Sequence, residues 1–193
     1  IRIAAEIRNE TRCNSLVGNK IVLIKKNGNE EEISEIPKCN IRFKGDCGLI
    51  KIHEDIRIDT SCNMIVGNKS VIYIGERCLL HNKCNLDIGN ENETLYIGAN
   101  AKIRSLFVFG GGEPNLEVII GNDFLSSLEL VLRPSDGHTI FHLNQPGHSI
   151  NKPEFGIHIG NHVWCGQRVL ITKDANIPND LIIAAGSVVG RKK

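Results

Sequence analysis

The stretch Ile159–Val188 decides the fold, because it divides into five consecutive hexads: IGNHVW, CGQRVL, ITKDAN, IPNDLI and IAAGSV. The hexads begin at Ile159, Cys165, Ile171, Ile177 and Ile183, and the residue four positions after each start is small or aliphatic. A helix repeats about every 3.6 residues and a strand about every 2, so neither produces a period of six. A chain that turns a corner after each short strand does, and three such strands close one triangular coil. The hexads therefore predict an all-β prism of stacked coils; an ordinary antiparallel sheet with accidental spacing is the alternative.

The composition suits a narrow prism. The chain has 193 residues, of which only 5% are aromatic and one is Trp, and its net charge of +1 predicts neither a nucleic-acid nor a membrane partner. No run approaches 18 apolar residues, so we expect no membrane span and no signal peptide. The seven Cys form no C-x-x-C pair and are odd in number. They are typical of small core residues in a reducing compartment, which predicts a cytoplasmic location, with disulfides as the alternative.

The first 50 residues are less regular than the rest. Residues 20–25 are predicted to form a short strand, residues 26–29 its turn, and residues 30–35 an acidic surface connection. We expect residues 1–50 to form an irregular β cap, or the first imperfect coils, which would protect the open end of the prism. Residues 51–193 would then form the prism itself.

The repeat also predicts where the prism carries insertions. Ile-Gly pairs recur every 23 residues at Gly75, Gly98 and Gly121, and the next pair, at Gly160, comes 39 residues later. A coil of about 18 residues thus carries about five extra residues twice and about 21 extra residues once. The two short insertions, near 89–93 and 110–115, and the long loop 138–158 are all expected on the same side. Loops that long are usually functional.

Three motifs resemble a known family. Residues 184–189, AAGSVV, resemble the ending GAGSVV of hexapeptide-repeat acyltransferases, although Ala184 departs from its first Gly. RPSDGH at 133–138, IN at 150–151 and IGNHVW at 159–164 are similar to bacterial capsular polysaccharide O-acetyltransferases, including the polysialic acid O-acetyltransferases. The general resemblance covers about 74–190. It implies a left-handed parallel β-helix that transfers an acetyl group from acetyl-CoA to a sugar hydroxyl of a polysaccharide acceptor.

His138 is the predicted catalytic base. Acetyl transfer to a hydroxyl needs a group that removes the hydroxyl proton, and neutral imidazole suits that role near neutral pH. Asp136 could orient the ring or shape the turn together with Gly137. His138 could also be an ordinary surface histidine, and for His142 and His148 that interpretation is preferred.

Trp164 is the second predicted site residue, because it occupies an outward hexad position where a large indole needs a cover. The resemblance pairs it with the catalytic His beside the thioester, and contact with a neighbouring subunit is the alternative. The resemblance implies an acetyl-CoA groove beside the last coils, with Gly166, Ala184 and Ala185 as its small residues. Lys173 and Lys192 could receive the CoA phosphates.

Three other functions are compatible with parts of the pattern. His158 and His162 could belong to a zinc site like that of β-helical carbonic anhydrases, but they need not converge, and we expect no metal. An N-acetyltransferase for a nucleotide-linked amino sugar would use the same fold and donor, and a non-catalytic scaffold would use the fold alone. Because one prism cannot enclose a substrate, and because the resembling enzymes pack three prisms around an axis, we expect a homotrimer with sites between subunits.

Overall fold

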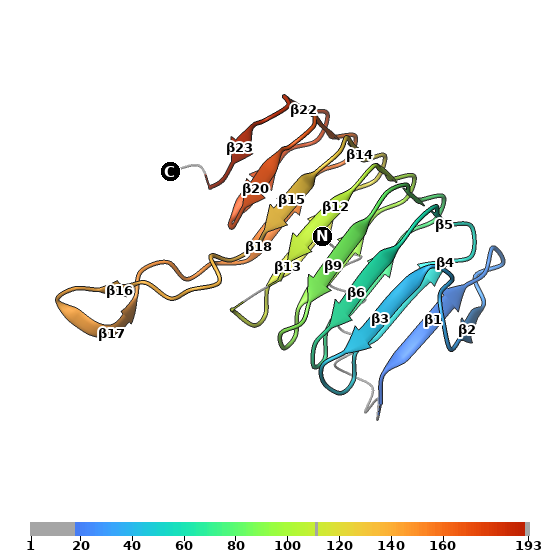
Figure 1. Ribbon diagram of the computed structural model, residues 1–193, viewed down its shortest axis with the longest axis horizontal. Helices are drawn as coiled ribbons and strands as arrows, with labels where there is room; N and C mark the ends of the chain where they lie inside the picture. Colours follow the sequence, from blue (N-terminus) through green and yellow to red (C-terminus); the bar gives the residue numbers. More distant parts are fainter. Residues whose placement is uncertain (1–17, 111, 192–193) are drawn as a thin grey trace.

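The computed structural model describes residues 18–110 and 112–191, and these form the predicted fold, an all-β, three-sided parallel β-helix (Figure 1). Side 1 contains β1 (Lys20–Ile24), β2 (Glu30–Glu32), β4 (Leu49–His53), β7 (Val71–Ile74), β10 (Thr94–Ile97), β13 (Glu117–Ile120), β18 (Gly156–Ile159) and β21 (Ala175–Ile177). Side 2 contains β5 (Arg57–Ile58), β8 (Leu79–Leu80), β11 (Lys102–Ile103), β14 (Leu125–Ser126), β19 (Trp164–Cys165) and β22 (Ile182–Ile183). Side 3 contains β3 (Cys39–Phe43), β6 (Cys62–Val66), β9 (Cys84–Ile88), β12 (Leu106–Phe109), β15 (Leu130–Arg133), β20 (Leu170–Thr172) and β23 (Val188–Val189).

The hexad starts form the core, as the period predicts. The chain visits sides 1, 2 and 3 in turn, and each strand pairs in parallel with the equivalent strand of the next coil. One inward column on side 1 consists of Ile52, Ile74, Ile97, Ile120, Ile159 and Ile177, each at most 4% exposed. On side 2 Ser126 takes a hexad start, and its buried hydroxyl has no hydrogen-bond partner in the described chain.

Tight corners join the sides, and their backbone explains part of the hexad. At the corner between sides 1 and 2, Asn100, Asp123 and His162 have φ near +60°, where non-glycine residues are uncommon. The preceding glycines are needed because the coils pack closely: a Cβ on Gly121 would lie 2.6 Å from the backbone of Gly160. In each Ile-Gly pair the Ile side chain therefore points into the core, the Gly allows the close contact between coils, and the corner follows.

The corner between sides 3 and 1, called corner 3–1 below, carries all the predicted insertions. The long insertion leaves β15 at Arg133 and returns in β18 at Gly156, so it begins and ends a few residues earlier than the expected 138–158. It has structure of its own, an antiparallel hairpin of β16 (Phe141–His142) and β17 (Gln145–Ser149). Figure 1 shows this hairpin projecting far from the prism. His158, expected at the end of the loop, lies instead within β18.

The β-helix begins before the expected boundary at residue 51. β1 pairs in parallel with β4, and β3 pairs in parallel with β6, so both strands belong to the first coils. The acidic segment predicted as a surface connection contains the strand β2, which pairs antiparallel with β1. Its three exposed glutamates cover the edge of side 1 with charge, which discourages pairing with another chain.

The described cysteines behave as core residues. Cys62, Cys78, Cys84 and Cys165 are buried, Cys39 and Cys47 are partly buried, and all six are free thiols; Cys13 lies outside the described residues. Burial raises the pKa of the Cys165 thiol to about 12, so it stays protonated and unreactive near neutral pH. Within residues 18–110 and 112–191, no helix is long and apolar enough to cross a membrane.

Candidate active site

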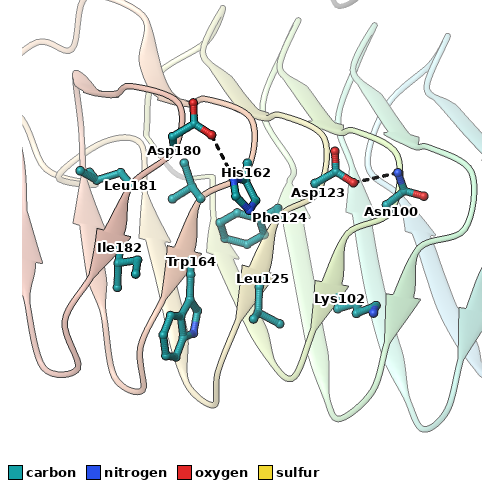
Figure 2. A pocket seen from close by; sticks show the side chains of 11 residues that line it. Asn100, Lys102, Asp123, Phe124, Leu125, His162, Trp164, Asp180, Leu181 and Ile182 are labelled. Carbon is teal, nitrogen blue, oxygen red and sulfur yellow. Dashed lines mark hydrogen bonds and ion pairs between the residues drawn. The ribbon is translucent and has the colours of Figure 1, made fainter.

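Trp164 lies on the outer face of side 2, in a column of exposed apolar side chains (Figure 2). The strand register puts Leu125, Trp164 and Ile182 side by side on β14, β19 and β22, with Lys102 of β11 next to Leu125. Neighbouring strands are about 4.8 Å apart, so these side chains lie within contact range of one another. Leu125 is 42% exposed, Trp164 46% and Ile182 68%. An exposed apolar column of this kind marks a binding surface.

A pocket of about 520 Å³ runs along this column. Apolar side chains line it from the strands, and polar pairs line it from the corner between sides 1 and 2. At that corner His162 Nδ1 lies 2.9 Å from a carboxylate oxygen of Asp180, and the Asn100 amide donates to Asp123 over 2.9 Å (Figure 2). The pocket therefore suits a ligand that has both apolar and polar parts.

Sequence reasoning missed Leu125, Ile182 and Lys102 as pocket residues, although the signal was present. Each directly precedes the inward residue that opens a hexad on side 2, which is also the position of Trp164. In a strand, residues next to an inward side chain point outward. Counting back from Trp164 through the insertions would have found the column.

His138 lies at the base of the long loop and is exposed to solvent. Gly137, with φ of +76°, supplies the left-handed turn that precedes it. A small hollow at this point is lined by residues of both loop stems and of the short insertion on the coil below. In the described part of the chain, the ring of His138 makes no hydrogen bond, and the Asp136 carboxylate accepts from Asn151 and Lys173 instead.

One chain does not bring His138 and Trp164 together. His138 leaves the prism at corner 3–1, whereas Trp164 lies on side 2, the side opposite that corner. Figure 1 shows this separation, with the side 2 strands along one edge of the prism and the loop leaving from the other. The pocket at Trp164 and the hollow at His138 share no lining residue.

Two solved structures share this architecture. The polySia-specific acetyltransferase NeuO matches with a TM-score of 0.66 and 19% sequence identity, over 91% of this chain and 79% of that chain. The polysialic acid O-acetyltransferase OatWY matches with a TM-score of 0.51 and 19% identity, over 91% of this chain and 81% of that chain. The fold is that of the polysialic acid O-acetyltransferases. Neither a protein-family profile nor a curated protein sequence matches the chain.

In this β-helix the predicted donor-binding residues fall in two places. Gly166, Ala184 and Ala185 lie at the corner between sides 2 and 3, where a Cβ on Gly166 would be 2.6 Å from the Ala185 nitrogen. The close contact between coils thus requires the glycine, and both alanines are exposed to solvent. Lys173 lies at corner 3–1 with its ammonium paired to Asp136, and Lys192 lies outside the described residues.

The other four histidines considered above lie in three different places. His158 Nε2 lies 2.7 Å from a carboxylate oxygen of Glu117 on the outer face of side 1, while His162 pairs with Asp180 at the corner. His142 and His148 lie on the exposed hairpin. Among residues 18–110 and 112–191, no three His, Cys, Asp or Glu side chains are grouped to hold a metal ion.

Proposed function

We propose that this protein is an acetyl-CoA-dependent O-acetyltransferase acting on a hydroxyl of a polysaccharide sugar, with a polysialic-acid-like polymer as the leading acceptor. The observation that carries the proposal is the fold match over 91% of the chain to two acetyltransferases of polysialic acid. The motifs around His138 and Trp164 support it. The exposed column beside Trp164 adds a surface of suitable chemistry for the donor.

In this proposal His138 is the general base. A nitrogen of its imidazole accepts the proton of the sugar hydroxyl as the hydroxyl oxygen bonds to the acetyl carbon. The same ring then returns that proton to the sulfur as the carbon–sulfur bond breaks, so the products are the acetylated sugar and the free thiol. The exposed position of His138 at the loop base allows a polymer chain to reach it.

Trp164 acts on the donor. Leu125, Trp164 and Ile182 form an apolar wall against which the pantetheine arm can lie. The indole N–H is then available to donate to the thioester carbonyl, where negative charge develops during the reaction. Lys102 at the far end of the pocket gives a cation for a phosphate group.

The proposal includes a site shared between subunits of a homotrimer. Because His138 and Trp164 lie on opposite sides of one prism, the corner 3–1 loop of one subunit must reach side 2 of its neighbour. The exposed apolar side chains of the hairpin, with Leu143 96% exposed at its tip, are suited to that contact. Head-to-tail contacts of this kind form a closed ring when the rotation between subunits closes.

The test is transfer of labelled acetyl from acetyl-CoA to a set of capsule polymers and nucleotide-linked amino sugars. We expect ester-linked label on a polymer, and about 10²–10⁴-fold lower kcat in His138→Ala with donor affinity nearly unchanged. His142→Ala, on the hairpin of the same loop, is the control and should keep its turnover. Amide-linked label on an amino sugar would favour the N-acetyltransferase alternative, and no transfer to any acceptor would favour a scaffold.

A further inference from the structure

Three polar residues from separate parts of the chain meet beneath His138: Asp136 on the outgoing stem of the loop, Asn151 on the returning stem, and Lys173 on the next coil. We call them the loop-base cluster. The proposed reaction assigns none of them a chemical step. Their contacts nevertheless determine where the backbone carrying His138 lies.

Asn151 joins the two stems of the loop. Its side-chain amide donates to the Asp136 carboxylate over 2.9 Å and to the carbonyl of His138 over 2.7 Å. Its side-chain oxygen accepts the backbone N–H of Ile140 over 2.7 Å. One side chain therefore holds the backbone on both sides of residue 139. These bonds satisfy backbone groups that would otherwise depend on water, so they fix the turn that presents His138.

Lys173 joins the loop to the prism. It belongs to the short corner between β20 and β21, and its ammonium donates to the Asp136 carboxylate and, over 2.6 Å, to the Asn151 carbonyl. The adjacent residue, Asp174, accepts the backbone N–H of Glu154 over 2.7 Å. The loop base is thus attached to a rigid coil, while Leu143 and the rest of the hairpin tip extend freely outward.

The Asp136 carboxylate stays ionised near neutral pH, so it remains a partner for the Lys173 ammonium. The Lys173 ammonium holds the pKa of the Asp136 carboxyl below its usual value of 3.8, with further help from the Asn151 amide. A carboxyl with a lowered pKa contributes stability that is lost only as the pH falls through that lowered value. The Asp136 carboxylate therefore stays ionised, and available to Lys173 and Asn151, at every pH above that lowered value.

These contacts also bear on the roles that the sequence suggested for Asp136 and Lys173. Asp136 was expected to orient the His138 ring or to shape the turn, and its carboxylate is engaged by Asn151 and Lys173. Lys173 was expected at the CoA phosphates, and its ammonium is engaged by two oxygen acceptors at the loop base. Both sets of contacts favour a role in building the loop.

We propose that Asp136, Asn151 and Lys173 are positioning residues that hold the His138 backbone at a fixed place relative to the prism, so that its imidazole meets the donor bound at Trp164. This inference rests on the proposed function. Small displacements of a catalytic group lower turnover strongly without changing how the donor binds. The cluster should accordingly affect kcat and leave the binding of acetyl-CoA unchanged.

The experiment compares two single variants, Asp136→Asn and Lys173→Met, with a double variant in which the charges are exchanged, Asp136→Lys plus Lys173→Asp. The double variant is called the reversed pair. We expect each single variant to lower kcat about 10–100-fold with an unchanged KM for acetyl-CoA, and the reversed pair to recover at least part of that loss. Amide hydrogen exchange of residues 139–150 should become faster in the single variants. The pH profile should keep its shape in Asp136→Asn, because a direct partner of the ring would shift it.

Glu154→Gln is the matched control, because it removes an ion pair with Arg191 at the same loop stem but outside the cluster. It should leave turnover and exchange as in the wild type. Wild-type turnover in the single variants, or exchange no faster than in Glu154→Gln, would overturn the positioning role while the proposed acetyl transfer stood. A wild-type protein that transfers no acetyl to any acceptor would remove the proposed function and the positioning role with it.

Discussion

At the scale of single residues, the exposure of Trp164 is the clearest sign of a ligand. An indole between two exposed aliphatic side chains leaves a continuous apolar strip in water, which is unfavourable unless something covers it. Phe109, on the outer face of side 3, is exposed to a similar extent, 44%, but lies outside the pocket. Comparing variants of Trp164 and Phe109 therefore distinguishes a loss caused by the pocket from a loss caused by removing any exposed aromatic side chain.

Trp164→Ala should weaken acetyl-CoA binding at least about tenfold and also lower turnover, because in the proposed function the indole covers the donor before and during the reaction. Trp164→Phe should retain much of the binding but lose the N–H donor, so turnover should fall more than affinity. Titration calorimetry with acetyl-CoA and steady-state kinetics measure the two effects. Phe109→Ala should match the wild type in both, and equal losses in Phe109→Ala and Trp164→Ala would contradict the assignment.

At the scale of elements, corner 3–1 contains a buried acid. Glu93 is the last residue of the first short insertion and is only 2% exposed, and its carboxylate accepts the backbone N–H of Asn90 over 2.9 Å. Burial raises the pKa of this carboxyl from 4.5 to about 7, against the opposing effect of the Asn90 hydrogen bonds. In the unfolded chain the same group ionises near its usual value. The folded state is therefore destabilised progressively as the pH rises from about 4.5 to about 7.

Glu93→Gln should remove this pH dependence. The variant and the wild type should be about equally stable at pH 4, and at pH 8 the variant should be more stable by about 3 kcal/mol, which corresponds to the shift in pKa. Urea unfolding at both pH values and one protein concentration measures the difference. Glu91→Gln, an exposed acid on the same corner, is the control. A constant difference between pH 4 and pH 8 would show that Glu93 does not titrate as proposed.

The periodic elements of this fold could be predicted from the sequence, and the contacts of the insertions could not. The hexads at 159–188 predicted the coils, the inward residues and the outward position of Trp164. These features are predictable because the position of a residue in a coil depends only on its place in the repeat. The pairing of Lys173 with Asp136 joins residues 37 positions apart through a loop without a period. For the first 50 residues the sequence left a β cap and first imperfect coils as alternatives, because β1 and β3 are joined by irregular connections that hide the repeat.

At the scale of the whole molecule, the proposed active site requires more than one chain. The corner 3–1 loop and side 2 face away from each other, so the proposed site can form only where two copies meet. In a head-to-tail ring every subunit gives its loop to one neighbour and its side 2 to the other. A trimer would therefore contain three equivalent shared sites.

Mixed oligomers test this arrangement. Coexpression of His138→Ala chains with Trp164→Ala chains should restore up to about one quarter of the wild-type activity, because that share of random interfaces joins an intact His138 to an intact Trp164. Each variant alone should stay nearly inactive. Mixed oligomers without activity would show that both residues act within one chain, and a sedimentation mass of one 21.3 kDa chain would exclude the shared site altogether.

Corner 3–1 is also a place where evolution can change the chain without disturbing the coils, and in the proposed function it faces the acceptor. The coils above and below close on each other whatever the corner contains, as the short insertions and the 134–155 loop all show. Lengthening a connection costs little, about 0.6 kcal/mol for each doubling. If the proposed function holds, the part of the chain nearest the acceptor can therefore change in length and composition while the proposed donor wall on side 2 is kept. Exchanging this one loop between related chains is a direct way to move polymer preference from one to another.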